Sequence, residues 1–136
     1  MEKMSEKKRF SLVARAKSFT HAVRGVFVFL RSTHNAWIHL FVTFIVLFLG
    51  FFFNISATEW IELIFAIGFV FVAEAFNTAI EIDMDLTSPE YHPYARDTKD
   101  VAAGAVLIAV KVAVLIGLII FVPKFISFLA KTHFYF

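Results

Sequence analysis

The sequence predicts an all-α membrane protein that consists of an N-terminal amphipathic surface helix and three transmembrane helices. Hydrophobic residues make up 60% of the 136 residues, well above the share of about 45–50% in soluble domains. Three apolar runs approach the length of about 20 residues with which a helix crosses a bilayer. Before them, apolar and basic residues are interleaved at helical spacing. We therefore expect residues 1–136 to form a single integral-membrane domain.

The N-terminal part is predicted to lie on the membrane surface. Residues 1–8 are polar and are expected to form a disordered tail. Residues 9–32 are predicted to form the surface helix, because their basic and apolar side chains favour an interface with anionic lipid. An amphipathic helix docked on protein is the alternative for this segment.

The three apolar runs predict transmembrane helices at residues 36–54, 60–82 and 99–122. Pro89 and Pro93 interrupt helical continuity before the third helix, and Pro123 is expected to end it. A short apolar and aromatic tail would follow. Gly104 and Gly117 in the third helix are expected to allow another helix to approach closely.

The distribution of Lys and Arg predicts the orientation of the chain. Eight of them precede the first span, the first loop has none, and the second loop has Arg96 and Lys99. By the positive-inside rule, the N-terminus and the second loop then face the cytoplasm. We expect a multi-pass protein of the bacterial cytoplasmic (inner) membrane. Lys111 lies about 18 Å into the third span and is expected to snorkel outward or to pair with another subunit.

A stripe of polar residues marks the candidate site. Glu74, Asn77 and Glu81 are spaced i, i+3 and i+7, which places them on one face of a helix. A charge at the centre of a membrane helix costs about 2.5–3.5 kcal/mol, so buried acids in such helices are functional candidates. The stripe is expected to face Lys99 across a short loop. The sequence therefore predicts a polar site at the cytoplasmic membrane edge.

These residue types suit phosphoryl transfer. That reaction needs carboxylates to hold Mg²⁺, a cation for the phosphates and a base near the accepting hydroxyl. By position along the helix, Glu81 suits the metal, Glu74 the base and Lys99 a phosphate. The glycine-rich loops of P-loop enzymes and of protein kinases are absent from the sequence. Cysteine is also absent, which excludes a thiolate nucleophile or metal ligand.

Several short motifs of the sequence resemble those of a known protein family. The specific ones are Glu74-Ala-Phe-Asn77-Thr-Ala-Ile-Glu81, Asp85, Glu90-Tyr91-His92, and Lys99-Asp100 with the Ala-rich segment after it. Two looser ones are Ser18-Phe19-x-x-Ala22-x-x-Gly25 and Asn35-x-x-x-His39. In these motifs the chain resembles the prokaryotic diacylglycerol kinase and undecaprenol kinase family. The resemblance covers about residues 17–122 and is most specific over residues 74–107.

The resemblance implies an ATP-dependent lipid kinase that uses Mg²⁺ and works as a homotrimer with sites shared between subunits. The acceptor would be undecaprenol or diacylglycerol, with a slight preference for undecaprenol, and no nucleic-acid partner is expected. Carried over by position, Glu74 resembles the catalytic base. The expected nucleotide-binding residues are His21, Asn77, Glu81, Lys99 and Asp100, and Glu81 also resembles a metal ligand.

One position departs from the family pattern. The family has a second metal-binding glutamate near the end of the surface helix, and Thr33 stands there in this sequence. A neutral hydroxyl is a poorer Mg²⁺ ligand than a carboxylate. Either Asp97 or a water held by Thr33 completes the metal shell, or metal use is weaker, or activity is lost. The alternative function is therefore a catalytically weak or inactive member that binds nucleotide or lipid in the membrane.

Overall fold

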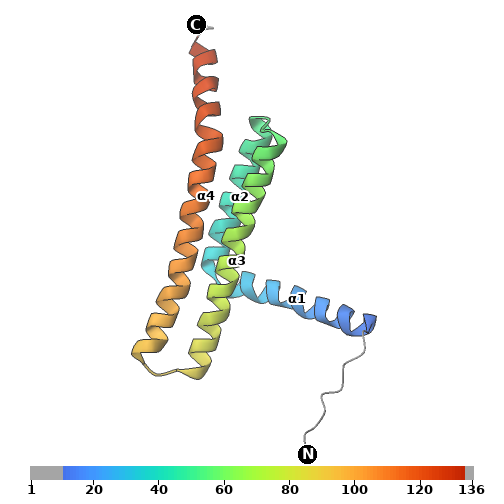
Figure 1. The fold of residues 1–136 in the computed structure, drawn as a ribbon, viewed down its shortest axis with the longest axis vertical. Coiled ribbons are helices and arrows are strands. Elements are labelled where there is room, and N and C mark those ends of the chain that lie inside the picture. Colours follow the sequence, from blue (N-terminus) through green and yellow to red (C-terminus); the bar gives the residue numbers. More distant parts are fainter. Residues whose placement is uncertain (1–10, 134–136) are drawn as a thin grey trace, which may run out of the picture.

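The computed structural model describes residues 11–133, except for the side chains of residues 14, 132 and 133. This part of the chain forms four α-helices: α1 (Leu12–Ser32), α2 (His34–Phe52), α3 (Ala57–Thr87) and α4 (Pro93–His133). Helices α2, α3 and α4 run along the long axis, and α1 leaves them at a wide angle (Figure 1). The all-helical class is confirmed. The predicted tail and the first residues of the predicted surface helix lie outside the described residues.

Helices α2, α3 and α4 are each long and apolar enough to cross a membrane. Many of their large apolar side chains face outward; Phe44 and Phe65, for example, are 71% and 75% exposed. The buried polar side chains of the described residues are those of Glu74, Asn77 and Thr78. This distribution is the reverse of that in a soluble protein and suits helices surrounded by lipid. The three predicted spans correspond in order to these three helices.

A capping box fixes the start of α3. The backbone N–H of Ser56 donates to Glu59 Oε2 at 2.6 Å, and the N–H of Glu59 donates to Ser56 Oγ at 3.3 Å. These two bonds satisfy two of the N–H groups that the first turn of a helix leaves without partners. Helix α3 therefore begins at Ala57 and not at the predicted residue 60. Its 31 residues extend over about 46 Å, more than the hydrocarbon core requires.

Helix α4 begins earlier than predicted, at Pro93 instead of Lys99. Proline is favoured at the first position of a helix, because its missing N–H is not needed there and its φ angle is already helical. The imidazole Nδ1 of His92 accepts a hydrogen bond from the backbone N–H of Tyr94 at 3.3 Å. The connection between α3 and α4 is therefore only the segment 88–92.

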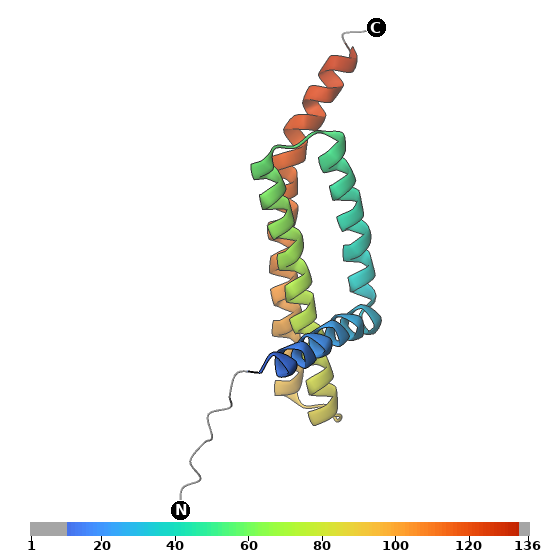
Figure 2. The ribbon, with the colours of Figure 1, turned by 90° about the vertical axis from the view of Figure 1, so that its right-hand side faces the viewer.

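The prediction that Pro123 ends the third span is wrong, because α4 continues through it to His133. Proline removes one backbone hydrogen bond, here the one to the carbonyl of Ile119, but membrane helices tolerate this when other groups compensate. Ser127 Oγ donates to the carbonyl of Pro123 at 2.8 Å, one turn beyond the carbonyl of Ile119 that the proline leaves without its backbone partner. Figure 2 shows that the upper end of α4 is inclined to the rest of the helix. The residues after position 123 are thus part of a long helix and not a separate tail.

An apolar core lies at the end of the bundle with the α2–α3 turn. Ile55, Leu63 and Ile120 are buried together there, and Trp60 packs against them. A Cβ atom on Gly50 would come within 2.7 Å of the Trp60 ring. The close approach of α2 and α3 at this end therefore requires glycine at position 50.

Gly104 and Gly117 on α4 have open space beside them. A Cβ atom on either residue would meet no atom within 4 Å in the described part of the chain. The expectation that these glycines allow another helix to approach closely is therefore not met within one chain.

Candidate active site

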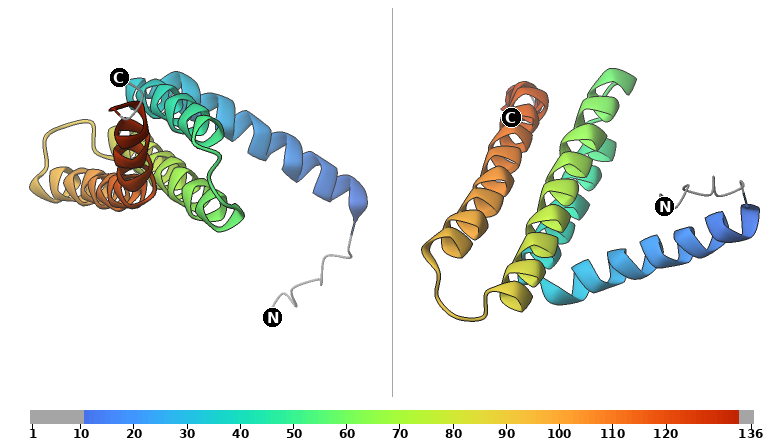
Figure 3. Two further views of the ribbon diagram at one scale, coloured as in Figure 1. Left: turned by 90° about the horizontal axis from the view of Figure 1, so that it is seen from above. Right: turned by 60° about the horizontal axis from the view of Figure 1, so that its bottom comes forward.

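Four polar side chains of α3 form a continuous stripe on one face of the helix. Glu74 is 1% exposed, Asn77 and Thr78 are buried, and Glu81 is half-buried. Glu74 is the largest almost completely buried side chain of the described residues. The predicted stripe therefore faces the interior of the protein. Residues 74–81 of α3 lie toward the end of the bundle from which α1 departs, as the right-hand view of Figure 3 shows.

The Glu74 carboxylate has one occupied and one free oxygen. His39 Nε2 on α2 lies 3.0 Å from Glu74 Oε1, and the His39 side chain is 19% exposed. Glu74 Oε2 is buried and has no hydrogen-bond partner among the described residues. A buried polar atom without a partner is costly, so it marks a position where a ligand group is expected.

Thr33, the single residue between α1 and α2, is tied to the stripe. Its Oγ1 lies 2.8 Å from Thr78 Oγ1, and Thr78 Oγ1 donates to the backbone carbonyl of Glu74 at 2.9 Å. Since a hydroxyl has only one hydrogen, the Thr33 hydroxyl must be the donor to Thr78. Thr33 thus links the α1–α2 corner to the helix that carries Glu74.

Asn77 and Glu81 provide oxygen atoms at the lower end of the stripe. Asn77 Nδ2 donates to Glu81 Oε1 at 3.1 Å, which leaves Asn77 Oδ1 buried and without a hydrogen-bond partner in the described part of the chain. Oxygen atoms are the ligands that Mg²⁺ prefers, and the ion is often held by one or two carboxylates together with substrate phosphates and water. Glu81 and the free amide oxygen therefore fit a partial Mg²⁺ shell.

A metal site made by protein alone is not present within residues 11–133. No group of three or more His, Cys, Asp or Glu side chains gathers there in a way that could hold an ion. Asp97, considered from the sequence as a replacement ligand, is exposed on α4. The oxygen atoms near Glu81 are thus sufficient only if phosphates or water supply the remaining ligands.

Lys99 and Asp100 lie on α4, but they point to different partners. Lys99 Nζ lies 2.6 Å from Asp85 Oδ1 on α3, and the charge of Glu81 also attracts it. Asp100 is 67% exposed and pairs with Arg96 one turn earlier on the same helix, at 3.5 Å. Both residues line a cavity of about 390 Å³ beside the segment 88–92. The structure therefore brings Lys99 toward the stripe, but not Asp100.

His21 lies on α1, beside the other flank of the stripe. With Arg24 it lines a shallow cavity of about 340 Å³ between α1 and α3, and Thr78 forms part of the opposite wall. Both His21 and Arg24 are exposed. Among the candidate nucleotide residues, His21 therefore lines one cavity and Lys99 and Asp100 line another, whereas Asn77 and Glu81 line neither.

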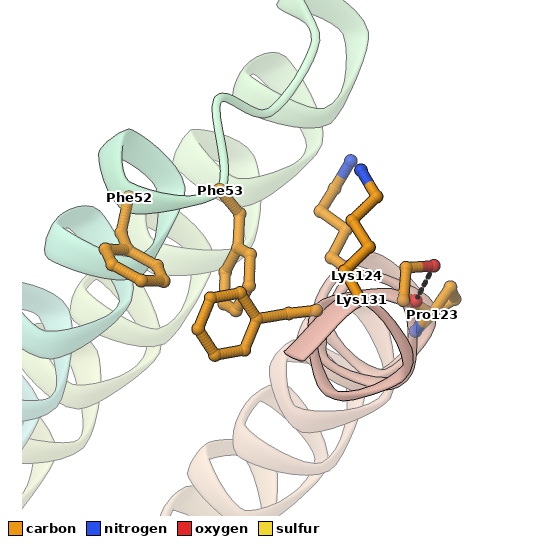
Figure 4. A pocket seen from close by; sticks show the side chains of 7 residues that line it. Phe52, Phe53, Pro123, Lys124 and Lys131 are labelled. Carbon is orange, nitrogen blue, oxygen red and sulfur yellow. Dashed lines mark hydrogen bonds between the residues drawn. The ribbon is translucent and has the colours of Figure 1, made fainter. Parts of the chain in front are cut away.

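Another cavity, of about 390 Å³, lies near the opposite end of the bundle between α2 and α4. Lys124 and Lys131 extend beside Phe52 and Phe53 there (Figure 4). Lys124 is already paired with Glu59, at 2.9 Å. Since the residues that line this cavity include no acid, we assign it no part in the chemistry.

Sequence reasoning assigns no role in the site to two residues near the stripe, His39 and Arg24. His39 is typical of an interfacial histidine, and the Asn35-x-x-x-His39 motif is the one sequence signal that points to a role for it. Arg24 follows His21 by three residues, a spacing that places both on one face of α1.

Lys111 is exposed on α4 and makes no ion pair or hydrogen bond within residues 11–133. That it snorkels outward or pairs with another subunit therefore stays a prediction.

Comparisons with known proteins identify the family of this chain. A family model described as prokaryotic diacylglycerol kinase matches residues 20–121. The undecaprenol kinase of Bacillus subtilis (strain 168) is 42% identical over 108 residues, which cover 79% of this chain and 88% of that protein. The diacylglycerol kinase of Synechocystis is 34% identical over 111 residues (81% and 63%), and that of Escherichia coli K12 is 37% identical over 62 residues (46% and 51%). This chain therefore belongs to the prokaryotic diacylglycerol kinase family.

Proposed function

We propose that this chain, a lipid kinase by family, transfers the γ-phosphate of ATP to the hydroxyl group of a membrane lipid. The observation that carries the proposal is the buried Glu74 carboxylate, which has one oxygen bonded to His39 and the other free. A positioned carboxylate of this kind suits a general base. Its place in an apolar helix suits an acceptor hydroxyl that arrives from the bilayer.

In the proposed reaction, Glu74 Oε2 accepts the proton of the lipid hydroxyl while the hydroxyl oxygen attacks the γ-phosphorus. A bond forms between these two atoms. The bond from the γ-phosphorus to the oxygen that bridges it to the β-phosphorus breaks, and ADP leaves with the electron pair. Most of the protein's contribution to such a transfer is positioning and charge stabilisation.

The residues on the nucleotide side would have distinct tasks. Glu81 and the free amide oxygen of Asn77 would hold Mg²⁺, which neutralises phosphate charge when bound. Lys99 would exchange its present carboxylate partner for a phosphate. His21 and Asp100 are proposed to contact the nucleotide, because His21 lines the cavity that Thr78 also lines and Asp100 lines the cavity that contains Lys99.

For the acceptor we favour undecaprenol over diacylglycerol. The relative with 42% identity is named undecaprenol kinase, whereas the relatives with 34% and 37% identity are named diacylglycerol kinases. The proposed location is the bacterial cytoplasmic membrane, with the N-terminus and the site at the cytoplasmic face. The basic residues of α1 and the absence of Lys and Arg from the α2–α3 turn support this orientation. Helix α1 would lie on the membrane surface.

A homotrimer with shared sites is also part of the proposal. In one chain, the cavity beside His21 and the cavity beside Lys99 are separate. A neighbouring subunit that brings one set of residues to the other would complete a single nucleotide site. Cross-linking of the purified protein in detergent, read by mass, tests the number of subunits.

The test of the function is ATP-dependent phosphorylation of undecaprenol and of diacylglycerol in mixed micelles. Glu74→Gln keeps the size of the side chain and one oxygen that can accept from His39, but it removes the charge. We expect it to lower turnover by about 10²–10⁴-fold, the usual contribution of a general base. Glu62→Gln, at an exposed position near the other end of α3, is the matched control. Normal turnover in Glu74→Gln would refute the assignment of the base.

The alternative is a catalytically weak or inactive family member that binds nucleotide or lipid. It is favoured because the Thr33 hydroxyl, at the position of a metal-binding glutamate, is already bonded to Thr78. ATP binding without phosphorylation of either lipid by the wild-type protein would support this alternative.

A further inference from the structure

We propose that His39 is a positioning residue, which holds the Glu74 carboxylate so that Oε2 faces the acceptor hydroxyl. The inference rests on the proposed role of Glu74 as the base. It follows from the one hydrogen bond that the Glu74 side chain makes within residues 11–133, in which His39 Nε2 lies 3.0 Å from Oε1.

The chemistry of the pair fixes the direction of the hydrogen bond. A general base must be ionised before it accepts a proton, and an ionised carboxylate can only accept hydrogen bonds, so in the proposed reaction His39 donates from Nε2–H. Hydrogen bonds to a charged group are shorter and stronger than those between neutral groups, and apolar surroundings strengthen them further. Here the surroundings are apolar: the His39 ring also lines a cavity of about 330 Å³ whose other walls include Leu63, Val70 and Val110.

The bond matters because the terminal torsion of a glutamate is soft. Rotation about the bond to the carboxyl carbon has no sharp staggered minima, so an unheld carboxylate samples many orientations. Within the described residues nothing else bonds the side-chain oxygens of Glu74. Without His39, the oxygen that must accept the proton would therefore be misplaced for much of the time. A misplaced base slows the chemical step, whereas substrate binding does not depend on it.

Three substitutions at position 39 separate this role from simple packing. His39→Gln keeps an N–H donor at similar reach, His39→Asn has the same amide on a shorter side chain, and His39→Leu fills the space without a donor. Thr43→Val is the matched control, because Thr43 lies one turn further along α2 and lines the same cavity without contacting Glu74. Each variant is measured for kcat, for the KM of ATP and of lipid, and for thermal unfolding in detergent.

We expect His39→Leu and His39→Asn to lower kcat by about 10- to 100-fold, the effect of one hydrogen bond to a charged group, while both KM values stay within about threefold. His39→Gln should recover most of kcat, and Thr43→Val should leave it unchanged. Because His39→Asn and His39→Gln differ only in length, they give the answer even if His39→Leu does not fold.

Two results would overturn the inference. One is a kcat close to that of wild type in His39→Asn, and the other is an equal loss in His39→Asn and His39→Gln. Glu74→Gln distinguishes this failure from failure of the proposed function. If Glu74→Gln is inactive while His39→Asn is fully active, only the role of His39 is wrong; if Glu74→Gln is active, the proposed base is wrong.

Discussion

Thr33 is the position at which one substitution tests both the metal site and the hydrogen-bond network. Its hydroxyl lies 2.8 Å from Thr78 Oγ1, and Thr78 precedes Glu81 by three residues on α3. Side chains at this spacing are neighbours on a helix, with Cβ atoms about 5–6 Å apart. The longer side chain in Thr33→Glu would therefore extend past Thr78 toward the oxygen atoms of Asn77 and Glu81.

Two opposing effects set the magnitude of this change. Without metal, Thr33→Glu removes a neutral hydrogen bond worth about 0.5–1.5 kcal/mol and adds a second negative charge near Glu81. With metal, a carboxylate replaces water or a neutral oxygen as a ligand, which a hard cation prefers. We expect the Mg²⁺ concentration for half-maximal turnover to fall by at least about tenfold, equivalent to about 1.4 kcal/mol.

The assay is a Mg²⁺ titration of lipid phosphorylation by the wild type, Thr33→Glu, Thr33→Gln and Thr33→Val. The glutamine variant has the length of glutamate without its charge, and the valine variant has the shape of threonine without its hydroxyl. Only Thr33→Glu should shift the titration. An unchanged Mg²⁺ requirement in Thr33→Glu would refute the reasoning that position 33 reaches the metal. Turnover in Thr33→Glu alone would favour an inactive wild type.

Two further substitutions test the packing and the ion pairs. Gly50→Ala should lower the free energy of unfolding by about 1–3 kcal/mol, because its Cβ would lie 2.7 Å from Trp60, whereas Gly68→Ala, with no atom within 4 Å, should not. Thermal unfolding in detergent checks this, and equal stabilities would contradict it. Asp85→Asn should lower the KM for ATP by releasing Lys99, with little effect on stability because the pair is exposed. An unchanged or raised KM for ATP would contradict the assignment of Lys99 to a phosphate.

The features that depend on local sequence could be predicted. The three spans follow from runs of apolar residues, and the polar face of α3 follows from the helical spacing of Glu74, Asn77 and Glu81. The helix starts that differ from the prediction lie where the sequence carries specific local signals. Ser56 and Glu59 form a capping box, and Pro93 occupies a position that favours proline. Both signals are readable from sequence.

The features that depend on how helices pack could not be predicted. That His39 meets Glu74 requires the rotation of α2 relative to α3, which no spacing within either helix encodes. The same holds for Gly50, whose neighbour Trp60 lies across the α2–α3 turn. Asp100 shows the converse: it follows Lys99 in sequence and lines the same cavity, but it pairs with Arg96 on α4, whereas Lys99 pairs with Asp85 on α3.

The side chains of the candidate site also hold α2 against α3. At one end of this helix pair Gly50 packs against Trp60, and near the other end Thr33 and His39 bond across to α3. Lipid gives helices no hydrophobic reason to associate, so close packing and such polar bonds, worth about 0.6–2 kcal/mol each, must do so. Truncation of Glu74 would therefore weaken the helix pair and the chemistry together. Glu74→Gln keeps a partner for His39, so a loss of turnover with unchanged thermal stability isolates the carboxylate charge as the cause.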